Sequence, residues 1–217
     1  MEQAGVVRST APRVGTLALV AVLALFAAWF LAGIAHYLAD YAPRSYGRFW
    51  PRRAGLLPHL VGGTTAIASG LVQLWLGFSG RTARLHRVLG RVYVGGVSVA
   101  ALGAFYLAAT IPGHFAYVSG LAVMALASLA TTAMAVVAIR RRAIATHKGW
   151  MIRSYTVMFA FVTFRLGGRA LGALVPAADD PIATDVDAAM AWAAWSIPLL
   201  LVEVWLQAKA LPRAKRG

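Results

Sequence analysis

Six long apolar runs, separated by short polar stretches rich in arginine, organise the chain. A helix that crosses the hydrocarbon core of a bilayer needs about 20 apolar residues. The runs that reach this length are Thr16–Ala39, Leu56–Phe78, Val88–Ile111, Phe115–Ile139, Trp150–Leu174 and Ala188–Ala208. The pattern therefore predicts an all-α membrane protein in which residues 1–217 form one integral membrane domain, a bundle of six transmembrane helices.

The composition agrees with a lipid environment. Hydrophobic residues make up 60% of the chain and charged residues only 13%, with a mean hydropathy of +0.69. Soluble domains carry about 25% charged residues. A net charge of +14 would also suit a nucleic-acid binder, but the arginines lie in short clusters beside apolar runs. We therefore expect the lipid bilayer as partner and no nucleic acid. Without cysteine, disulfides and thiolate metal sites are excluded.

The distribution of basic residues predicts the orientation. Short loops that remain in the cytoplasm carry an excess of lysine and arginine. Most of the basic residues fall before the first run, between the second and third, between the fourth and fifth, and after the sixth. Both termini are therefore predicted to be cytoplasmic, with the protein in the bacterial inner membrane. The first loop is an exception, because it contains Arg44, Arg48, Arg52 and Arg53.

Small residues recur at helical spacing in two neighbouring runs. Gly62, Ala66 and Gly70 follow one another every four residues, and so do Gly96, Ala100 and Ala104. Small side chains on one face allow membrane helices to approach closely. We expect these two ridges to take part in helix packing.

The histidines fall at matched depths in the predicted bundle. His59 and His114 open the second and fourth runs at the outer face, and His86 and His147 open the third and fifth at the inner face. Helices two and four are thus predicted to offer one pair, and helices three and five another. His36 lies near the outer end of the first run, without an evident partner.

Paired histidines of this kind are compatible with haem binding. Two neutral imidazoles can ligate one haem iron axially, and the propionates of haem favour basic residues at the water edge. At the inner face Arg87, Arg91 and Arg153 lie near His86 and His147 in the sequence. This topology resembles that of the six-helix diheme transmembrane cytochromes b. The resemblance implies haem b as cofactor, held by His86 with His147 and by His59 with His114.

Three motifs carry a second resemblance, which covers most of the chain. They are "HLVGGTTAIASGLVQLW", "LHRVLGRVYV" and "HKGWMIRSYTVMFAFVTFRL". They resemble the bacterial integral-membrane family catalogued as domain of unknown function 2306. The matching positions are His59, Gln73, His86, Arg87, Gly90, Arg91, Tyr93, His147, Trp150, Met151, Arg153, Ser154 and Arg165. The family implies a membrane fold and no particular activity, so whether the chain is an enzyme stays open.

Several functional hypotheses follow. The leading one is a haem-binding electron-transfer protein that exchanges electrons with a quinone or another redox partner. The alternatives are a small proton-linked transporter or channel lined by His59, Gln73 and Glu203, and an assembly factor for another membrane complex. Polar groups inside a membrane are costly and mark functional sites by default. Histidines at headgroup depth can also simply bind interfacial groups, and Glu203 can simply pair with an inner arginine.

Overall fold

The computed structural model describes residues 14–79, 83–112, 114–172 and 181–211, and within these residues the regular elements are all helices. They are α1 (Val14–Ala39), α2 (Pro43–Tyr46), the 3₁₀ helix η1 (Gly47–Arg52), α3 (Arg53–Ser79), α4 (Ala83–Thr110), α5 (Phe115–Arg140), α6 (Ile144–Gly172) and α7 (Pro181–Ala210). The six long helices coincide with the six predicted runs. The all-α prediction is confirmed for the described residues.

Five of these helices are long and apolar enough to cross a membrane, and α6 is the exception. Polar and charged residues such as Arg153, Ser154 and Arg165 lower its hydropathy. α6 lies against α1, α3, α5 and α7, and Ser154, Tyr155 and Met158 on it are buried. Because neighbouring helices cover it, the polar groups of α6 can find partners within the protein rather than in lipid.

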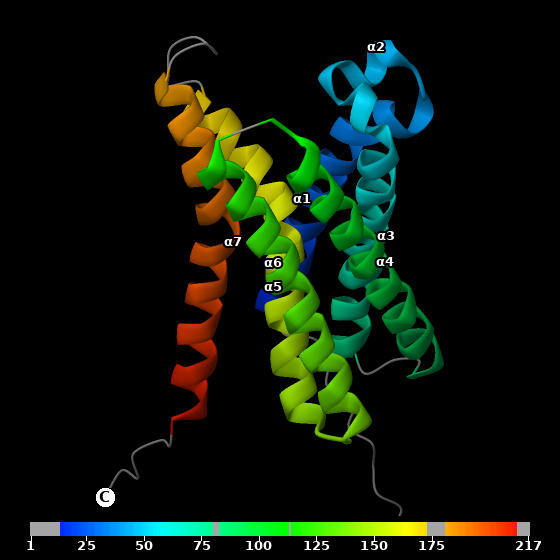
Figure 1. The fold of residues 1–217 in the computed structure, drawn as a ribbon. Coiled ribbons are helices and arrows are strands. Elements are labelled where there is room, and N and C mark those ends of the chain that lie inside the picture. Colours follow the sequence, from blue (N-terminus) through cyan, green and yellow to red (C-terminus); the bar gives the residue numbers. More distant parts are fainter. Residues whose placement is uncertain (1–13, 80–82, 113, 173–180, 212–217) are drawn as a thin grey trace, which may run out of the picture.

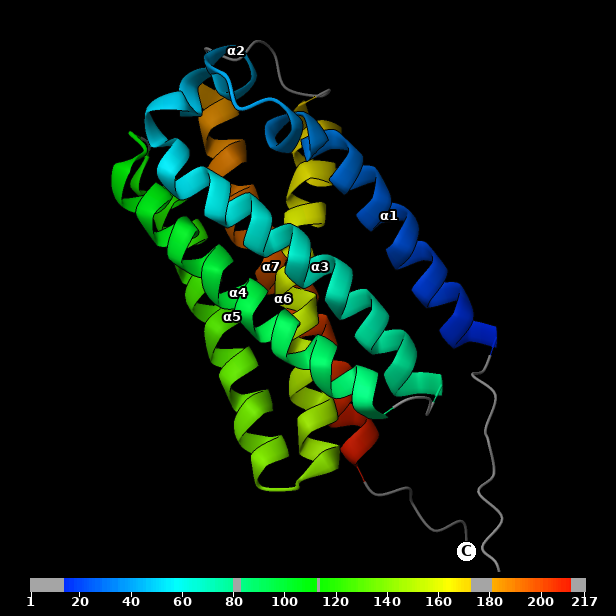
Figure 2. The same cartoon turned by 90° about the vertical axis from the view of Figure 1, so that its right-hand side faces the viewer.

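The long helices run alternately up and down. Figures 1 and 2 show the bundle with α2 at one end and the α5–α6 turn at the other. We call the first the α2 end. The second, which carries the first turns of α4 and α6 and the last turns of α5 and α7, we call the basic end. The basic residues described there are Arg84, Arg87, Arg91, Arg140, Arg141, Arg142, Lys148, Arg153 and Lys209.

α3 and α4 form the closest helix pair, and the two small-residue ridges meet between them. A Cβ on Gly62 would lie 2.5 Å from the Ala100 backbone nitrogen and 2.6 Å from the Gly96 carbonyl oxygen. A Cβ on Gly96 would lie 2.9 Å from the Ala66 backbone nitrogen. The predicted packing role is therefore confirmed for these residues. Gly70, the third member of its ridge, lies under the rings of Tyr93 and Tyr155 instead.

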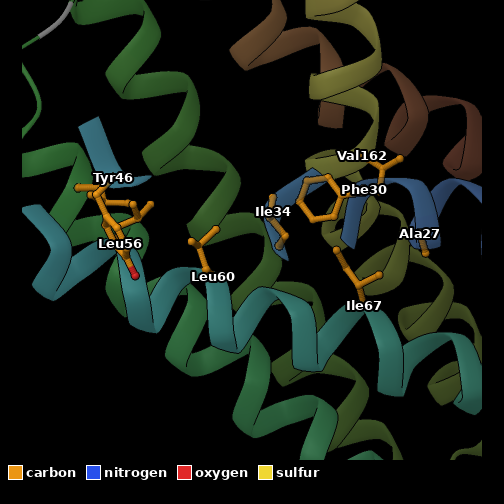
Figure 3. Close-up of a cluster of buried hydrophobic side chains, with 9 residues drawn as sticks. Ala27, Phe30, Ile34, Tyr46, Leu56, Leu60, Ile67 and Val162 are labelled. Atoms are coloured by element: carbon orange, nitrogen blue, oxygen red, sulfur yellow. The ribbon is translucent and has the colours of Figure 1, made fainter. Parts of the chain in front are cut away.

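α1 packs on the opposite side of α3 through an apolar cluster. Figure 3 shows Phe30 and Ile34 of α1 beside Leu60 and Ile67 of α3, with Val162 of α6 nearby. All of these side chains are buried. Much of the rest of α1 is exposed, as expected of a helix on the outside of a bundle that contacts lipid.

Three arginines of the first loop, Arg44, Arg52 and Arg53, have structural partners. Asp40 accepts hydrogen bonds from Arg44 (2.9 Å) and Ser45 (2.6 Å), and these bonds hold the pKa of its carboxyl below the usual range. Arg52 donates to the Thr110 carbonyl oxygen at the end of α4 (2.7 Å). Arg53 lies over the ring of Trp50. The loop thus folds as a small cap, α2 with η1, which Arg52 joins to the end of α4.

Candidate functional site

His86 and His147 both lie at the basic end. Each is the fourth residue of its helix, α4 for His86 and α6 for His147. Both side chains are partly buried, and the two imidazoles are near enough to interact electrostatically. Both helices begin before the apolar runs that predicted them, because the polar turn at the membrane surface is helical as well. The histidines therefore sit within the first turn rather than ahead of it.

Backbone contacts orient this pair of helices. The His147 Nδ1 lies 2.9 Å from the Ala135 carbonyl oxygen of α5. Since a carbonyl can only accept, Nδ1 carries the proton and the neutral ring keeps its Nε2 lone pair for another partner. The Gln73 side-chain amide of α3 donates to the His86 backbone carbonyl (2.8 Å) and packs against Gly90. Gln73 thus ties α3 to the start of α4.

The outer histidines are not brought together in the same way. His59 points between helices, with Nδ1 3.0 Å from the Ala100 carbonyl oxygen of α4 and its ring 5.0 Å from the Phe161 ring of α6. His114 is exposed and precedes the first turn of α5. None of the contacts described for His59 involves it. The geometry therefore groups His86 with His147 more clearly than His59 with His114.

The three arginines expected near the inner pair have different surroundings. Arg87 and Arg91 are exposed on α4. Arg153 is mostly buried and forms a salt bridge with Glu203 of α7 (2.6 Å between Nη2 and Oε2). Its guanidinium also lies over the Trp150 ring. The prediction that Glu203 pairs with an inner arginine is confirmed, whereas Arg87 and Arg91 remain exposed to ligands at the basic end.

A chain of buried hydroxyl groups joins α4, α6 and α5 in the middle of the bundle. The Tyr93 and Ser154 oxygens lie 2.7 Å apart, and so do those of Ser154 and Thr132. Thr132 donates its proton to the Ser128 carbonyl oxygen (2.7 Å). Since each hydroxyl has one proton, Ser154 donates to Thr132 and Tyr93 donates to Ser154. All three side chains are buried, and the chain of bonds has one direction.

Sequence reasoning gave this hydroxyl chain no role. Tyr93 and Ser154 belong to the motifs quoted above, but Thr132 lies in an alanine-rich run that gives no signal. A mostly apolar cavity of about 10 Å³ lies near these hydroxyl groups, and its lining includes Ser128 and Phe161. A volume of this order is about the minimum for one water molecule. Phe161 is also the aromatic neighbour of His59.

These features define the class: an all-helical membrane protein whose apolar interior contains a few hydrogen-bonded polar side chains. The chain matches, over residues 56–206, the family model DUF2306, whose description is "predicted membrane protein". The match covers more than half of the chain, so this protein belongs to that family. No curated protein and no solved structure matches it.

Proposed function

We propose that this protein is a six-span redox protein of the bacterial inner membrane that binds haem b through His86 and His147. The observation that carries the proposal is that these two imidazoles lie at the same end of the bundle, in the first turns of α4 and α6, and are near enough to interact electrostatically. α6 supplies the sixth span, since it runs the length of the bundle among the other five. By the charge rule, the basic end and both termini face the cytoplasm.

The residues around the pair suit this cofactor. His147 donates its Nδ1 proton to a backbone carbonyl, which is the arrangement that orients metal-ligating histidines and leaves Nε2 available. Arg87 and Arg91 would bind the haem propionates, since both are exposed on α4, the helix that carries His86. A haem with two imidazole ligands supplies one-electron exchange. His59 has a similarly oriented ring, but the exposure of His114 gives an outer haem less support.

An absorption spectrum of the purified protein tests this proposal. Protein from cells supplied with haem should show a Soret band that shifts on reduction, and His86→Ala and His147→Ala should each abolish it. His36→Ala is the matched control, because His36 is an exposed histidine on α1 that stacks on Tyr37. Folded protein that stays colourless, or a band unchanged in both inner variants, would rule out this site. Loss of part of the band in His59→Ala would reveal a second haem.

A second candidate function, proton transfer through the bundle, is favoured by the hydroxyl chain. Tyr93, Ser154 and Thr132 are buried at membrane depth, where unpaired polar groups are costly, and their single-direction hydrogen bonds are a geometry that can relay protons. The alternative is a purely structural role, in which the hydroxyl groups only hold α4, α5 and α6 together.

Proton flux into proteoliposomes with an internal pH-sensitive dye separates these alternatives. We expect Tyr93→Phe to lower the flux by about tenfold while costing only about 1 kcal/mol of stability. Tyr155→Phe is the control, because the Tyr155 hydroxyl is buried in the same region but donates to the Ile67 carbonyl outside the chain. Equal fluxes in the wild type and Tyr93→Phe, or none in the wild type, would leave the hydroxyls with a structural role.

A further inference from the structure

A groove of about 390 Å³ lies between α7 and the α5–α6 pair in the half of the bundle nearer the basic end. In the other half, α7 is held tightly. There Trp192 donates from its indole nitrogen to the Ala116 carbonyl of α5 (2.9 Å), and Thr163 of α6 donates to the Ala194 carbonyl (2.7 Å). Figure 1 shows the remaining part of α7 standing apart from α5 and α6.

Pro198 explains the hydrogen bond between α6 and the Ala194 carbonyl of α7. Proline has no N–H, so the carbonyl four residues earlier, that of Ala194, loses its helical partner. The Thr163 hydroxyl replaces that partner. Beyond Pro198, Leu199 packs against a buried cluster of α5 and α6, and the salt bridge between Arg153 and Glu203 lines the groove. The groove thus lies between two contacts of α7 with α6: the hydrogen bond from Thr163 to the Ala194 carbonyl and the salt bridge between Arg153 and Glu203.

Trp195, one of the residues that line the groove, carries a hydrogen-bond donor that the protein leaves unused. The Trp195 Nε1 atom is buried and finds no acceptor among the residues that the structure describes. Trp195 lines the groove, together with Thr131, Trp150 and Ser196. The Thr131 and Ser196 hydroxyl protons are already donated to backbone carbonyls. A buried N–H without a partner costs free energy, so this position favours a ligand that brings an acceptor.

The remaining lining restricts the ligand class. Arg153 and Glu203 neutralise each other, so the groove has no net charge to attract a phosphate. Two tryptophan rings provide flat apolar surface, which suits a planar ring. Leu200, 63% exposed, lies at the edge on a helix that is mostly turned outwards, so an apolar tail can leave the groove towards lipid. The volume falls within the usual range for small-molecule sites, about 300–1,000 Å³.

We propose that this groove binds a neutral, lipid-soluble molecule with a planar ring and a carbonyl oxygen, a membrane quinone by chemical class, and that the Trp195 ring turns on binding so that its buried Nε1–H donates to that carbonyl. The proposal goes beyond the haem and hydroxyl sites and rests on neither of them. It concerns binding alone, so haem-free protein is expected to bind the molecule as well.

Retention of a short-tailed benzoquinone by the immobilised full chain in nanodiscs, relative to empty nanodiscs, tests the site. We expect saturable binding that Trp195→Phe weakens about tenfold, because the ring is kept and only the N–H is lost. Trp192→Phe is the matched control, since its N–H serves Ala116 outside the groove. Leu200→Trp, a change at an exposed position, should block entry without loss of folding.

Each outcome decides the proposal. Saturable binding that both Trp195→Phe and Leu200→Trp weaken, and Trp192→Phe does not, supports it. Absence of saturable binding to folded wild type, or equal binding by the two tryptophan variants, overturns it. Nanodiscs with and without anionic phosphatidylglycerol distinguish the competing occupant: if the anionic lipid displaces the quinone completely, the groove is a phospholipid headgroup site and the neutral assignment is wrong.

Discussion

Replacing Gly62 or Gly96 by alanine is expected to destabilise the bundle severely, by about 3 kcal/mol or more, whereas the same change at Gly63 or Gly95 leaves it as stable or slightly more so. The added methyl group at Gly62 would lie 2.5 Å from a backbone nitrogen of α4. Backbone atoms cannot rotate aside as a side chain can, so α3 and α4 must move apart. Overpacking that forces such backbone shifts costs at least 1–3 kcal/mol.

Gly63 and Gly95, which neighbour Gly62 and Gly96 in the sequence, provide matched controls. Gly63 and Gly95 are on the same two helices, but a Cβ on either would meet nothing within 4 Å. Alanine has a higher helix propensity than glycine, by about 1 kcal/mol. Gly63→Ala and Gly95→Ala should therefore be at least as stable as the wild type. Thermal unfolding in detergent measures all four variants. If Gly62→Ala and Gly63→Ala unfold at the same temperature, the close α3–α4 contact is absent in the membrane protein.

The long helices could be predicted because the bilayer sets a length that the sequence must match. Their ends could not, because hydropathy reports where the hydrocarbon lies and not where helical hydrogen bonding stops. α7 begins at Pro181, seven residues before the apolar run, and α6 begins at Ile144, before the polar "THKG" turn. The small-residue ridges were predicted correctly, since a four-residue repeat places glycines on one face whatever the rest of the fold.

The cap and the hydroxyl chain depend on contacts between distant segments. Arg52 meets the end of α4 58 residues later, and Tyr93 meets Ser154 61 residues later. Serine and threonine in an alanine-rich helix look the same whether they bond their own helix or a neighbour. The matched positions of His86 and His147 could be predicted from the topology, since both lie in the first turn of a helix at the same end of the bundle. Their role as haem ligands stays a prediction.

Replacing Glu203 by glutamine is expected to lower the free energy of unfolding measurably, and the companion change Arg153→Gln should recover most of that loss. Arg153 is only 16% exposed, so removing Glu203 leaves a poorly solvated positive charge without a counter-ion. Breaking a buried ion pair costs about 3–5 kcal/mol. We expect less here because the Glu203 side chain is 38% exposed, and solvent already weakens the pair.

The two single variants should also differ from each other. Arg153→Gln leaves the more exposed carboxylate, which can turn to water and keeps its hydrogen bond from Gln207 (2.7 Å). It should therefore cost less than Glu203→Gln. A double-mutant cycle of unfolding free energies in detergent gives the coupling between the residues. Gln207→Ala is the control for the side-chain hydrogen bond alone. Additive effects, or a double variant less stable than Glu203→Gln, would show that the ion pair does not fix α7 to α6.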